Sequence, residues 1–150
     1  MSIIGIAASK DHLYLVMTTA EKADFTVMQH HRIPLDSANW SSLVASLSSI
    51  LGAYNAEDAI EDFALVCCAS GMYGASPEAF KAEGFAELKC QELGHPISQI
   101  TKQSLKKHLS CQSGQKWQAA AKDLFNADKK ITYFSSGFDA AISGAYGVAK

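Results

Sequence analysis

Lysine side chains are concentrated between residues 101 and 130, and they are the groups in this chain best suited to bind anions. That segment holds seven lysines against two aspartates, a net charge of +5. Residues 1–100 hold five Lys or Arg against twelve Asp or Glu, a net charge of −7. The seven lysines are Lys102, Lys106, Lys107, Lys116, Lys122, Lys129 and Lys130. Clustered positive charge is typical of a nucleic-acid or anion site, but the solvated faces of two helices give the same pattern. Both interpretations stay open.

A second group able to do chemistry is the run His30-His31-Arg32. Imidazole rings bind metal ions, but neighbouring residues on a strand point to opposite faces, and the sequence shows no further ligand for a site there. We therefore expect an exposed edge strand whose charge discourages pairing, or a contact with a partner chain.

Four cysteines, at positions 67, 68, 90 and 111, have neither the spacing of a zinc site nor that of a redox pair. Cys67 and Cys68 are adjacent in a strand-like run, so their side chains should point to opposite faces. We expect buried free thiols in a reducing compartment.

Composition indicates one globular domain over residues 1–150. Hydrophobic residues make up 48% of the chain and charged residues 19%, which separates it from disordered proteins. No apolar run approaches the roughly 20 residues that span a bilayer. The first six residues have neither a basic region nor a signal-peptide cleavage pattern, so we expect a cytoplasmic protein.

The first half of the chain reads as strands around one helix. Residues 2–8, 12–18 and 25–33 are three strand-like runs with short connections, which predicts an antiparallel meander. A helix follows, with Gly52 as its C-terminal cap. Its apolar positions at helical spacing are Trp40, Leu43, Val44, Leu47, Ile50 and Leu51. The continuous apolar run at residues 63–69 predicts a central strand.

The second half is mostly helical. After a loop at residues 70–75, Ser76-Pro77-Glu78 is a strong helix start, and Gly94 ends that helix. We expect its apolar side to carry Phe80, Gly84, Phe85 and Leu88. Residues 96–100 form a short strand. Thr101, Ser113 and Ser136 are the predicted caps of three further helices. The apolar stripe of the second of these is Trp117, Ala120, Ala121, Leu124 and Phe125. That of the last is Phe138, Ala141, Ile142, Ala145, Tyr146 and Ala149. Residues 131–134 fit either a strand or a connector.

This order predicts an α/β fold with a mixed five-stranded sheet and helices on both faces. The first and fourth strands should be central, parallel neighbours, with the meander extending one side. The order resembles the ribonuclease H-like fold. Within that fold the chain is most similar to the Holliday-junction resolvases of the RuvC type and to short uncharacterised bacterial relatives of them. Local similarity lies at Ile3-Ile4-Gly5-Ile6, from Phe63-Ala64-Leu65-Val66 through Glu83-Gly84 to Pro96, and at Gly137-Phe138-Asp139-Ala140-Ala141.

The resemblance implies a metal site that this chain does not complete. Nucleases of this fold hold two Mg²⁺ ions about 4 Å apart with clustered carboxylates. The first carboxylate would follow Gly5-Ile6, where this chain has Ala7. The second would fall at Cys67 or an immediate neighbour, Val66 or Cys68. On the last helix Asp139 remains, but Ser136 stands where its partner belongs. Asp139 is either a remnant ligand or an early-helix acid favoured by the helix dipole.

One carboxylate cannot hold two magnesium ions, and a thiol is a poor ligand for them. We therefore expect no catalytic residue and no cofactor. The resemblance then implies a binding module for nucleic acid or protein, and a homodimer, as the resolvases are, with Lys102, Lys106, Lys107 and Lys116 as candidate contacts. Lys116 follows Ser113-Gly114-Gln115 as a resolvase lysine follows a similar turn. The loop at residues 71–74, with Met72 and Tyr73, is a further candidate ligand crevice.

Two alternatives remain. An active nuclease would rebuild its Mg²⁺ centre from Asp139 with Glu78, Glu83 or Glu87 of the helix that begins at Pro77. Glu83 and Glu87 share a helical face, although nearby Lys81 and Lys89 favour a solvated one. A structural accessory of a larger assembly is the third interpretation.

Overall fold

The structure, a computed structural model, describes residues 1–67, 76–126 and 138–150. Its strands are β1 (Ser2–Ala8), β2 (His12–Thr19), β3 (Val27–Pro34), β4 (Ile60–Cys67) and β5 (Ile97–Thr101). Its helices are α1 (Trp40–Glu57), α2 (Pro77–Leu93), α3 (Lys102–His108), α4 (Trp117–Asn126) and α5 (Asp139–Val148). In these ranges no helix is both long and apolar enough to cross a lipid bilayer. The predicted loop at 70–75, the segment 131–134 and Ser136 lie outside the described residues.

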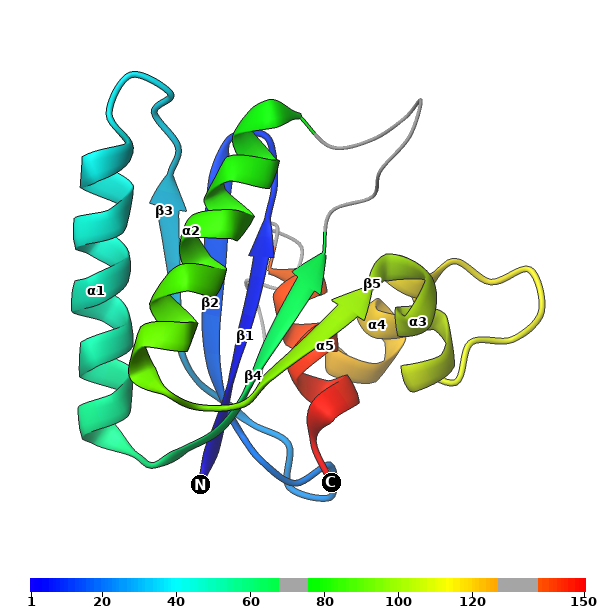
Figure 1. The fold of residues 1–150 in the computed structure, drawn as a ribbon. Coiled ribbons are helices and arrows are strands. Elements are labelled where there is room, and N and C mark those ends of the chain that lie inside the picture. The colour runs from blue at the N-terminus through cyan, green and yellow to red at the C-terminus, as the bar shows by residue number, and fades with distance from the viewer. Residues whose placement is uncertain (68–75, 127–137) are drawn as a thin grey trace.

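The five strands form one mixed sheet in the order β3-β2-β1-β4-β5 (Figure 1). β1 pairs antiparallel with β2 and parallel with β4, β2 pairs antiparallel with β3, and β4 pairs parallel with β5. The predicted meander and the central, parallel pair of first and fourth strands are confirmed. Because β1 and β4 run parallel, their carboxyl ends meet at the same edge of the sheet.

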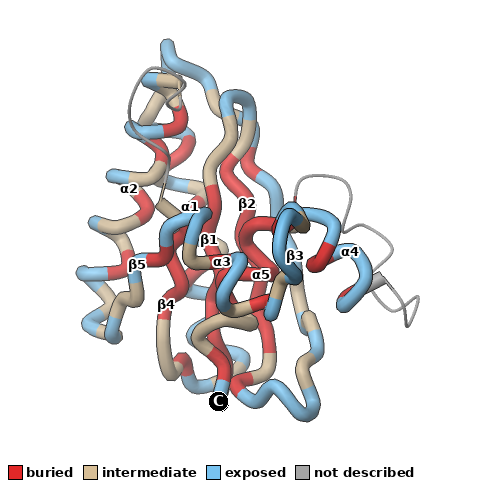
Figure 2. Tube along the Cα trace, turned by 90° about the vertical axis from the view of Figure 1, so that its right-hand side faces the viewer, coloured by how far each residue is buried: buried red, intermediate tan, exposed pale blue. Residues whose placement is uncertain are grey.

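Helices cover both faces of the sheet, as predicted. One core lies between the sheet and α1 and α2, and the other lies between the sheet and α3, α4 and α5. Alternate residues of β1 serve both cores, with Ile4 and Ile6 facing α1 and α2 and Ile3 and Ala7 facing α5. In Figure 2 the buried trace runs through the central strands and along α5. The strands with continuous apolar sequence are therefore the central ones.

Two glycines let α5 pack closely on the centre of the sheet. A Cβ atom at Gly5 would overlap the carbonyl oxygen of Ala141, and one at Gly144 would lie 2.6 Å from Cγ2 of Val66. Position 5 therefore requires glycine unless the backbone of α5 moves, and a side chain at position 144 requires a shift of α5 or of the Val66 side chain. The close contact fixes where the first turn of α5 meets the ends of β1 and β4.

The structure corrects the predicted end of α1. The helix does not stop at Gly52 but continues to Glu57, and the N–H of Asp58 donates to the carbonyl oxygen of Tyr54. Tyr54 is fully buried, and its hydroxyl lies 2.5 Å from Nδ1 of His31 on β3. Tertiary packing of Tyr54 therefore outweighs the local preference of glycine for a helix end.

The predicted apolar side of α2 is also wrong. The buried residues are Ala79, Ala82, Ala86 and Cys90. Phe80 and Leu88 are 44% and 50% exposed, Gly84 is exposed, and Phe85 is only half-buried. A helix that lies close to a sheet favours small residues on its inner side, so the large apolar residues marked the wrong side. The ends of α2 agree with the prediction, because Ser76 caps the first turn and Gly94 adopts a left-handed conformation after Leu93.

Of the remaining predicted caps, Thr101 is confirmed and Ser113 is wrong. The Thr101 hydroxyl accepts a hydrogen bond from the N–H of Ser104 at the start of α3. Ser113 lies in a turn with Gly114, and α4 begins only at Trp117. Leu124, expected in the buried stripe of α4, is 43% exposed. The other four residues of that stripe are buried.

Candidate functional site

Apolar side chains occupy the carboxyl ends of the two central strands on the side that faces α5. Ala7, at the end of β1, is 4% exposed, and Val66 of β4 is its neighbour in the parallel register. Both belong to the core beneath α5. A methyl and an isopropyl group thus stand side by side where the resemblance implies two carboxylates, and neither can bind a cation.

Asp139 is the acid that the structure brings to this place. It is the first residue of α5, and its Oδ1 accepts a hydrogen bond of 2.9 Å from the N–H of Ala140. Burial raises the pKa of Asp139, while the Ala140 N–H and the charge of Lys102 act in the opposite direction. Lys102 is exposed at the start of α3. The arrangement gives one half-buried acid with a lysine nearby, which can bind or donate a proton but cannot form a two-metal centre.

Cys67 faces the other side of the sheet. It follows Val66, so its side chain points toward α2, and the carboxylates that influence it are Glu83 and Glu87. Burial raises the pKa of the Cys67 thiol, and the negative charge of Glu83 raises it further. Glu87 accepts a hydrogen bond of 2.9 Å from Nε2 of Gln99 on β5. The sheet therefore separates Cys67, Glu83 and Glu87 from Asp139, and the structure does not bring the two groups of candidate ligands together.

Another acid on the α5 side of β4 lies too far away to help. Asp62 pairs with Ile3 at the opposite end of β1, four residues before Val66 or about 13 Å along the strand. No group of three or more His, Cys, Asp or Glu side chains in the described ranges could hold a metal ion. The segments 68–75 and 127–137 contain one acid between them, Asp128. The donor set does not fit the pair of magnesium ions that the fold family implies.

Exposed lysines lie along α3 and α4, and one of them, Lys102, is near enough to Asp139 to oppose the rise in pKa that burial causes there. Lys102 and Lys106 are one turn apart on α3, and Lys107 lies in its last turn. Lys116 precedes α4, directly after the turn at Ser113 and Gly114, and Lys122 lies on α4. All five are exposed, and none forms an ion pair with another described residue. Lys129 and Lys130 are outside the described ranges. The described lysines therefore leave their positive charge available to a ligand.

The three-dimensional arrangement is similar to that of RuvC from Thermus thermophilus. A structure described as "Thermus thermophilus RuvC structure" matches with a TM-score of 0.71 over 98% of this chain and 92% of that chain. A structure described as "T. thermophilus RuvC in complex with Holliday junction substrate" matches with a TM-score of 0.65, over 97% and 94%. Identity is 14% in both cases. The chain has the RuvC fold. No protein-family model and no curated protein matches the sequence.

The similarity to RuvC shows the fold alone, and the chemistry of the site depends on the side chains at the ends of β1 and β4 and at the start of α5. Ala7 and Asp139 lie on the same side of the sheet. The position beside Ala7 belongs to Val66, and Cys67 points the other way. Cys68 and Ser136 fall outside the described residues. Cys67, Cys90 and Cys111 are free thiols, of which Cys90 is fully buried, and burial raises its pKa to about 12.

Sequence reasoning missed an aromatic cluster beside Asp139. Phe138 contacts Tyr14 of β2 and His30 of β3, with ring centroids 5.1 Å apart in both cases. Burial, followed by the neighbouring His31, lowers the pKa of His30. The sequence holds no sign of this contact, because more than 100 residues separate His30 from Phe138. The two imidazoles of the predicted edge strand thus have different surroundings, with His30 on the α5 side and His31 on the α1 side.

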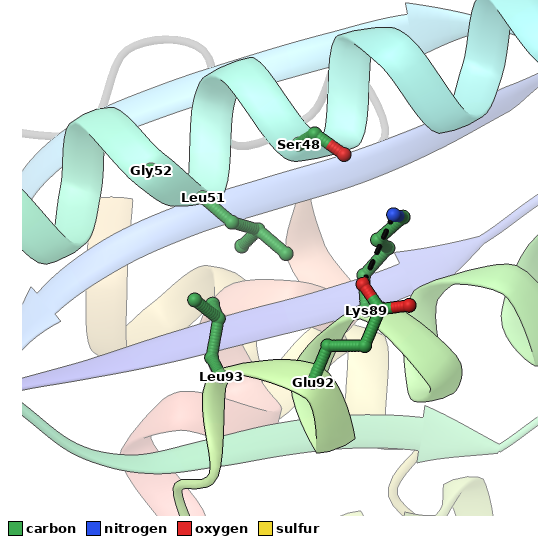
Figure 3. Close-up of a pocket in the computed structure, with 6 residues that line it drawn as sticks. All are labelled: Ser48, Leu51, Gly52, Lys89, Glu92 and Leu93. Atoms are coloured by element: carbon green, nitrogen blue, oxygen red, sulfur yellow. Dashed lines mark hydrogen bonds and ion pairs between the residues drawn. The ribbon is translucent and has the colours of Figure 1, made fainter.

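A cavity of about 300 Å³ lies between α1 and α2, on the side of the sheet away from Asp139 (Figure 3). Its lining residues are Ser48, Leu51, Gly52, Lys89, Glu92 and Leu93. Leu51 and Leu93 extend into the space between the helices, and Lys89 Nζ forms an ion pair of 3.0 Å with Glu92. The two charged groups of the lining therefore neutralise each other.

Proposed function

We propose that this chain is a nucleic-acid-binding module of RuvC fold that does not carry out two-metal cleavage. One observation carries the proposal: on the α5 side of the strand ends, Ala7 and Val66 stand where the resemblance implies carboxylates, and Asp139 is the one acid that the described residues bring there. Stabilising the attacking and leaving oxygens of a phosphodiester requires two bound cations, and hence several carboxylates. A domain without those carboxylates can still bind nucleic acid through its shape and surface charge.

The lysines of α3 and α4 favour nucleic acid as the partner. These exposed lysines form no ion pair with an acid among the described residues: Lys102, Lys106, Lys107, Lys116 and Lys122. Unpaired surface lysines bind phosphates by releasing the counterions that surround a nucleic acid. One of the two similar RuvC structures is itself described as a complex with a Holliday junction substrate, which supports the same partner class here.

Binding should be measured by fluorescence anisotropy in EDTA, with a labelled four-way junction, duplex and single strand. We expect binding at low salt that weakens steeply between about 50 and about 200 mM salt. Lys102→Gln with Lys106→Gln should weaken all three complexes and reduce the slope of log K against log salt by about 0.7–0.9 for each phosphate that the lysines no longer neutralise. Lys81→Gln, on α2 at the other side of the sheet, is the matched control and should bind normally.

Two results would contradict the proposal. Absence of binding to all three nucleic acids at low salt would favour a protein partner or a structural role in an assembly. Cleavage of the junction that depends on Mg²⁺ and on Asp139 would instead indicate a nuclease with a metal centre built from other residues.

We propose in addition that the module is a homodimer joined through α2. Phe80 and Leu88 are large and exposed, and Gly84 lies between them with no atom within 4 Å of a Cβ built there. The three residues are four positions apart, so they form one stripe along the helix in which Phe80 and Leu88 protrude and Gly84 leaves a gap between them. Such a stripe can pack against the same stripe of a second copy around a two-fold axis. Glu92, one turn beyond Leu88, belongs to the cavity beside α1 and extends the same surface.

A further inference from the structure

One face of the β2–β3 hairpin, at the edge of the sheet, carries aromatic and cationic side chains. In the register of these strands Tyr14 pairs with Arg32, and Val16 pairs with His30. Tyr14 and Val16 belong to the core on the α5 side, so Arg32 and His30 project to that side as well. His12 lies two residues before Tyr14 and shares the same face.

Ring contacts join these residues into one continuous cluster. The ring centroids of His12 and Tyr14 are 5.9 Å apart, and those of Tyr14 and Phe138 are 5.1 Å apart. His30 and Phe138 meet at 5.1 Å with nearly perpendicular planes. Tyr14 and Phe138 are buried, whereas His30 is exposed and His12 half-buried. The buried pair holds the two imidazoles in place, and the imidazoles meet the solvent. We call His12, Tyr14, His30, Arg32 and Phe138 the aromatic edge.

Arg32 adds a permanent positive charge to the aromatic edge. Its side chain is exposed, and it forms no ion pair with any described carboxylate. A single charge would be enough to protect an edge strand from pairing with another chain. Protection of the edge does not require the two imidazoles that pack on buried aromatic rings. A planar ring can stack on a base, and a guanidinium can bind a phosphate, so the two kinds of group together suit a nucleotide.

The aromatic edge and Lys102, one of the lysines already proposed to bind nucleic acid, both lie near the first turn of α5. Phe138 precedes Asp139, the first residue of α5, and Lys102 of α3 is close enough to Asp139 to influence its pKa. The first turn of α5 therefore lies near Lys102 of α3 and also makes ring contacts with the β2–β3 hairpin. A nucleic-acid strand bound by the lysines can continue past Ala7 and Val66 toward β3.

We propose that the aromatic edge binds unpaired nucleotides of a single-stranded nucleic acid, with bases against His30 and His12 and a phosphate at Arg32. The inference rests on the proposed function and specifies that the bound nucleic acid is single-stranded. Unpaired bases expose their faces to stacking, whereas in a duplex these faces are covered by neighbouring bases. Stacking is tolerant of sequence, so we expect affinity for single strands without strong sequence preference.

The test compares a labelled oligo(dT) with a duplex of equal length, by fluorescence anisotropy on folded variants. His30→Ala should weaken oligo(dT) binding by about five-fold or more, the loss expected when one stacked base loses its platform, and should leave duplex binding unchanged. His30→Phe should restore binding because it keeps a planar ring. Arg32→Gln should weaken oligo(dT) binding and lower its salt dependence.

His31→Gln is the matched control, because His31 is the next residue on β3 and faces Tyr54 on the other side of the sheet. It should bind oligo(dT) normally. The inference is overturned if His30→Ala and Arg32→Gln bind oligo(dT) as the unaltered chain does, or if they weaken duplex binding equally. If the Lys102 and Lys106 variants still weaken binding in that case, the proposed function stands without this inference. Absence of any binding would overturn both.

Discussion

Ala7 and Val66 fill the space beneath the first turn of α5 with methyl groups, and this bears on whether a metal site can be restored. A carboxylate at Ala7 would enter a position that is 4% exposed, close to the acid that α5 already contributes. Burying an unpaired charge is costly, and a second negative charge nearby increases that cost. Restoring one ligand should therefore destabilise the chain without creating a nuclease.

Ala7→Asp should lower the melting temperature, and the loss should be larger at pH 8 than at pH 5, because ionisation of the new acid is what the buried site opposes. Thermal melting at the two pH values measures this, with Lys10→Asp in the exposed β1–β2 turn as control. A variant as stable as the unaltered chain, or one stabilised by Mg²⁺, would show that the position tolerates a ligand.

Asp62 is a second acid whose surroundings disfavour its charge. Its Oδ1 is buried without a hydrogen-bond partner among the described residues, and its Oδ2 accepts a hydrogen bond of 2.9 Å from the Ser98 hydroxyl. Burial raises the pKa of Asp62, so the folded state binds its proton more tightly than the unfolded state does. Its contribution to stability is therefore fully present below the unfolded pKa of about 3.9 and is lost as pH rises through the folded pKa.

Asp62→Asn should accordingly raise the melting temperature at pH 7, and the gain should shrink as the pH falls through the folded-state pKa of Asp62. Asp11→Asn, at an exposed turn, should change little over the same pH range. Equal melting temperatures of Asp62→Asn and the unaltered chain at pH 7 would mean that the buried oxygen is solvated.

At the scale of elements, one glycine lies where α5 touches the sheet and another lies on an open side of α1, so the pair separates the effect of close packing from that of helix propensity. Gly144→Ala brings a methyl group against Val66 and should cost about 1–3 kcal/mol of the free energy of unfolding. Gly52→Ala, inside α1 with no atom within 4 Å, should gain up to about 1 kcal/mol. Urea unfolding of both variants measures the difference, and a stable Gly144→Ala protein would show that α5 can shift on the sheet.

Elements differ in how far the sequence determines them. Apolar runs and the Ser76-Pro77 start predicted β1, β4 and α2 correctly, because local patterning and capping agree with the final packing there. The apolar pattern did not predict which side of α2 is buried. Because α2 packs closely on the sheet, its buried side carries alanines, and Phe80 lies on the exposed side. Likewise, the resemblance implied a site position at Cys67 or an immediate neighbour, and only the register of the strand shows which of these residues faces α5.

The candidate site was only partly visible in the sequence for a related reason. Ala7 and Asp139 could be located from short motifs at the strand end and the helix start. The contact of Phe138 with His30 depends on how the last helix crosses the sheet, and no local pattern encodes it.

At the scale of the whole molecule, the exposed stripe on α2 predicts the oligomeric state. Leu88→Glu should convert a dimer into a monomer, because it places a charge in the apolar stripe that forms the two-fold contact. Light scattering after gel filtration measures the mass. Leu124→Glu is the matched control, since Leu124 is 43% exposed on α4 at the opposite side of the sheet. An unaltered chain that is already monomeric at micromolar concentration would contradict the dimer.

The central claim, a RuvC fold without its metal centre, is tested most directly by thermal melting with increasing Mn²⁺ or Mg²⁺. A ligand that binds only the folded state raises the free energy of unfolding by RT ln(1 + L/Kd), where L is the concentration of free ligand, so the melting temperature keeps rising after L exceeds Kd. We predict no metal-dependent rise up to millimolar metal, and the same flat response in Asp139→Asn. A rise with metal concentration in the unaltered chain that is absent from Asp139→Asn would contradict the account.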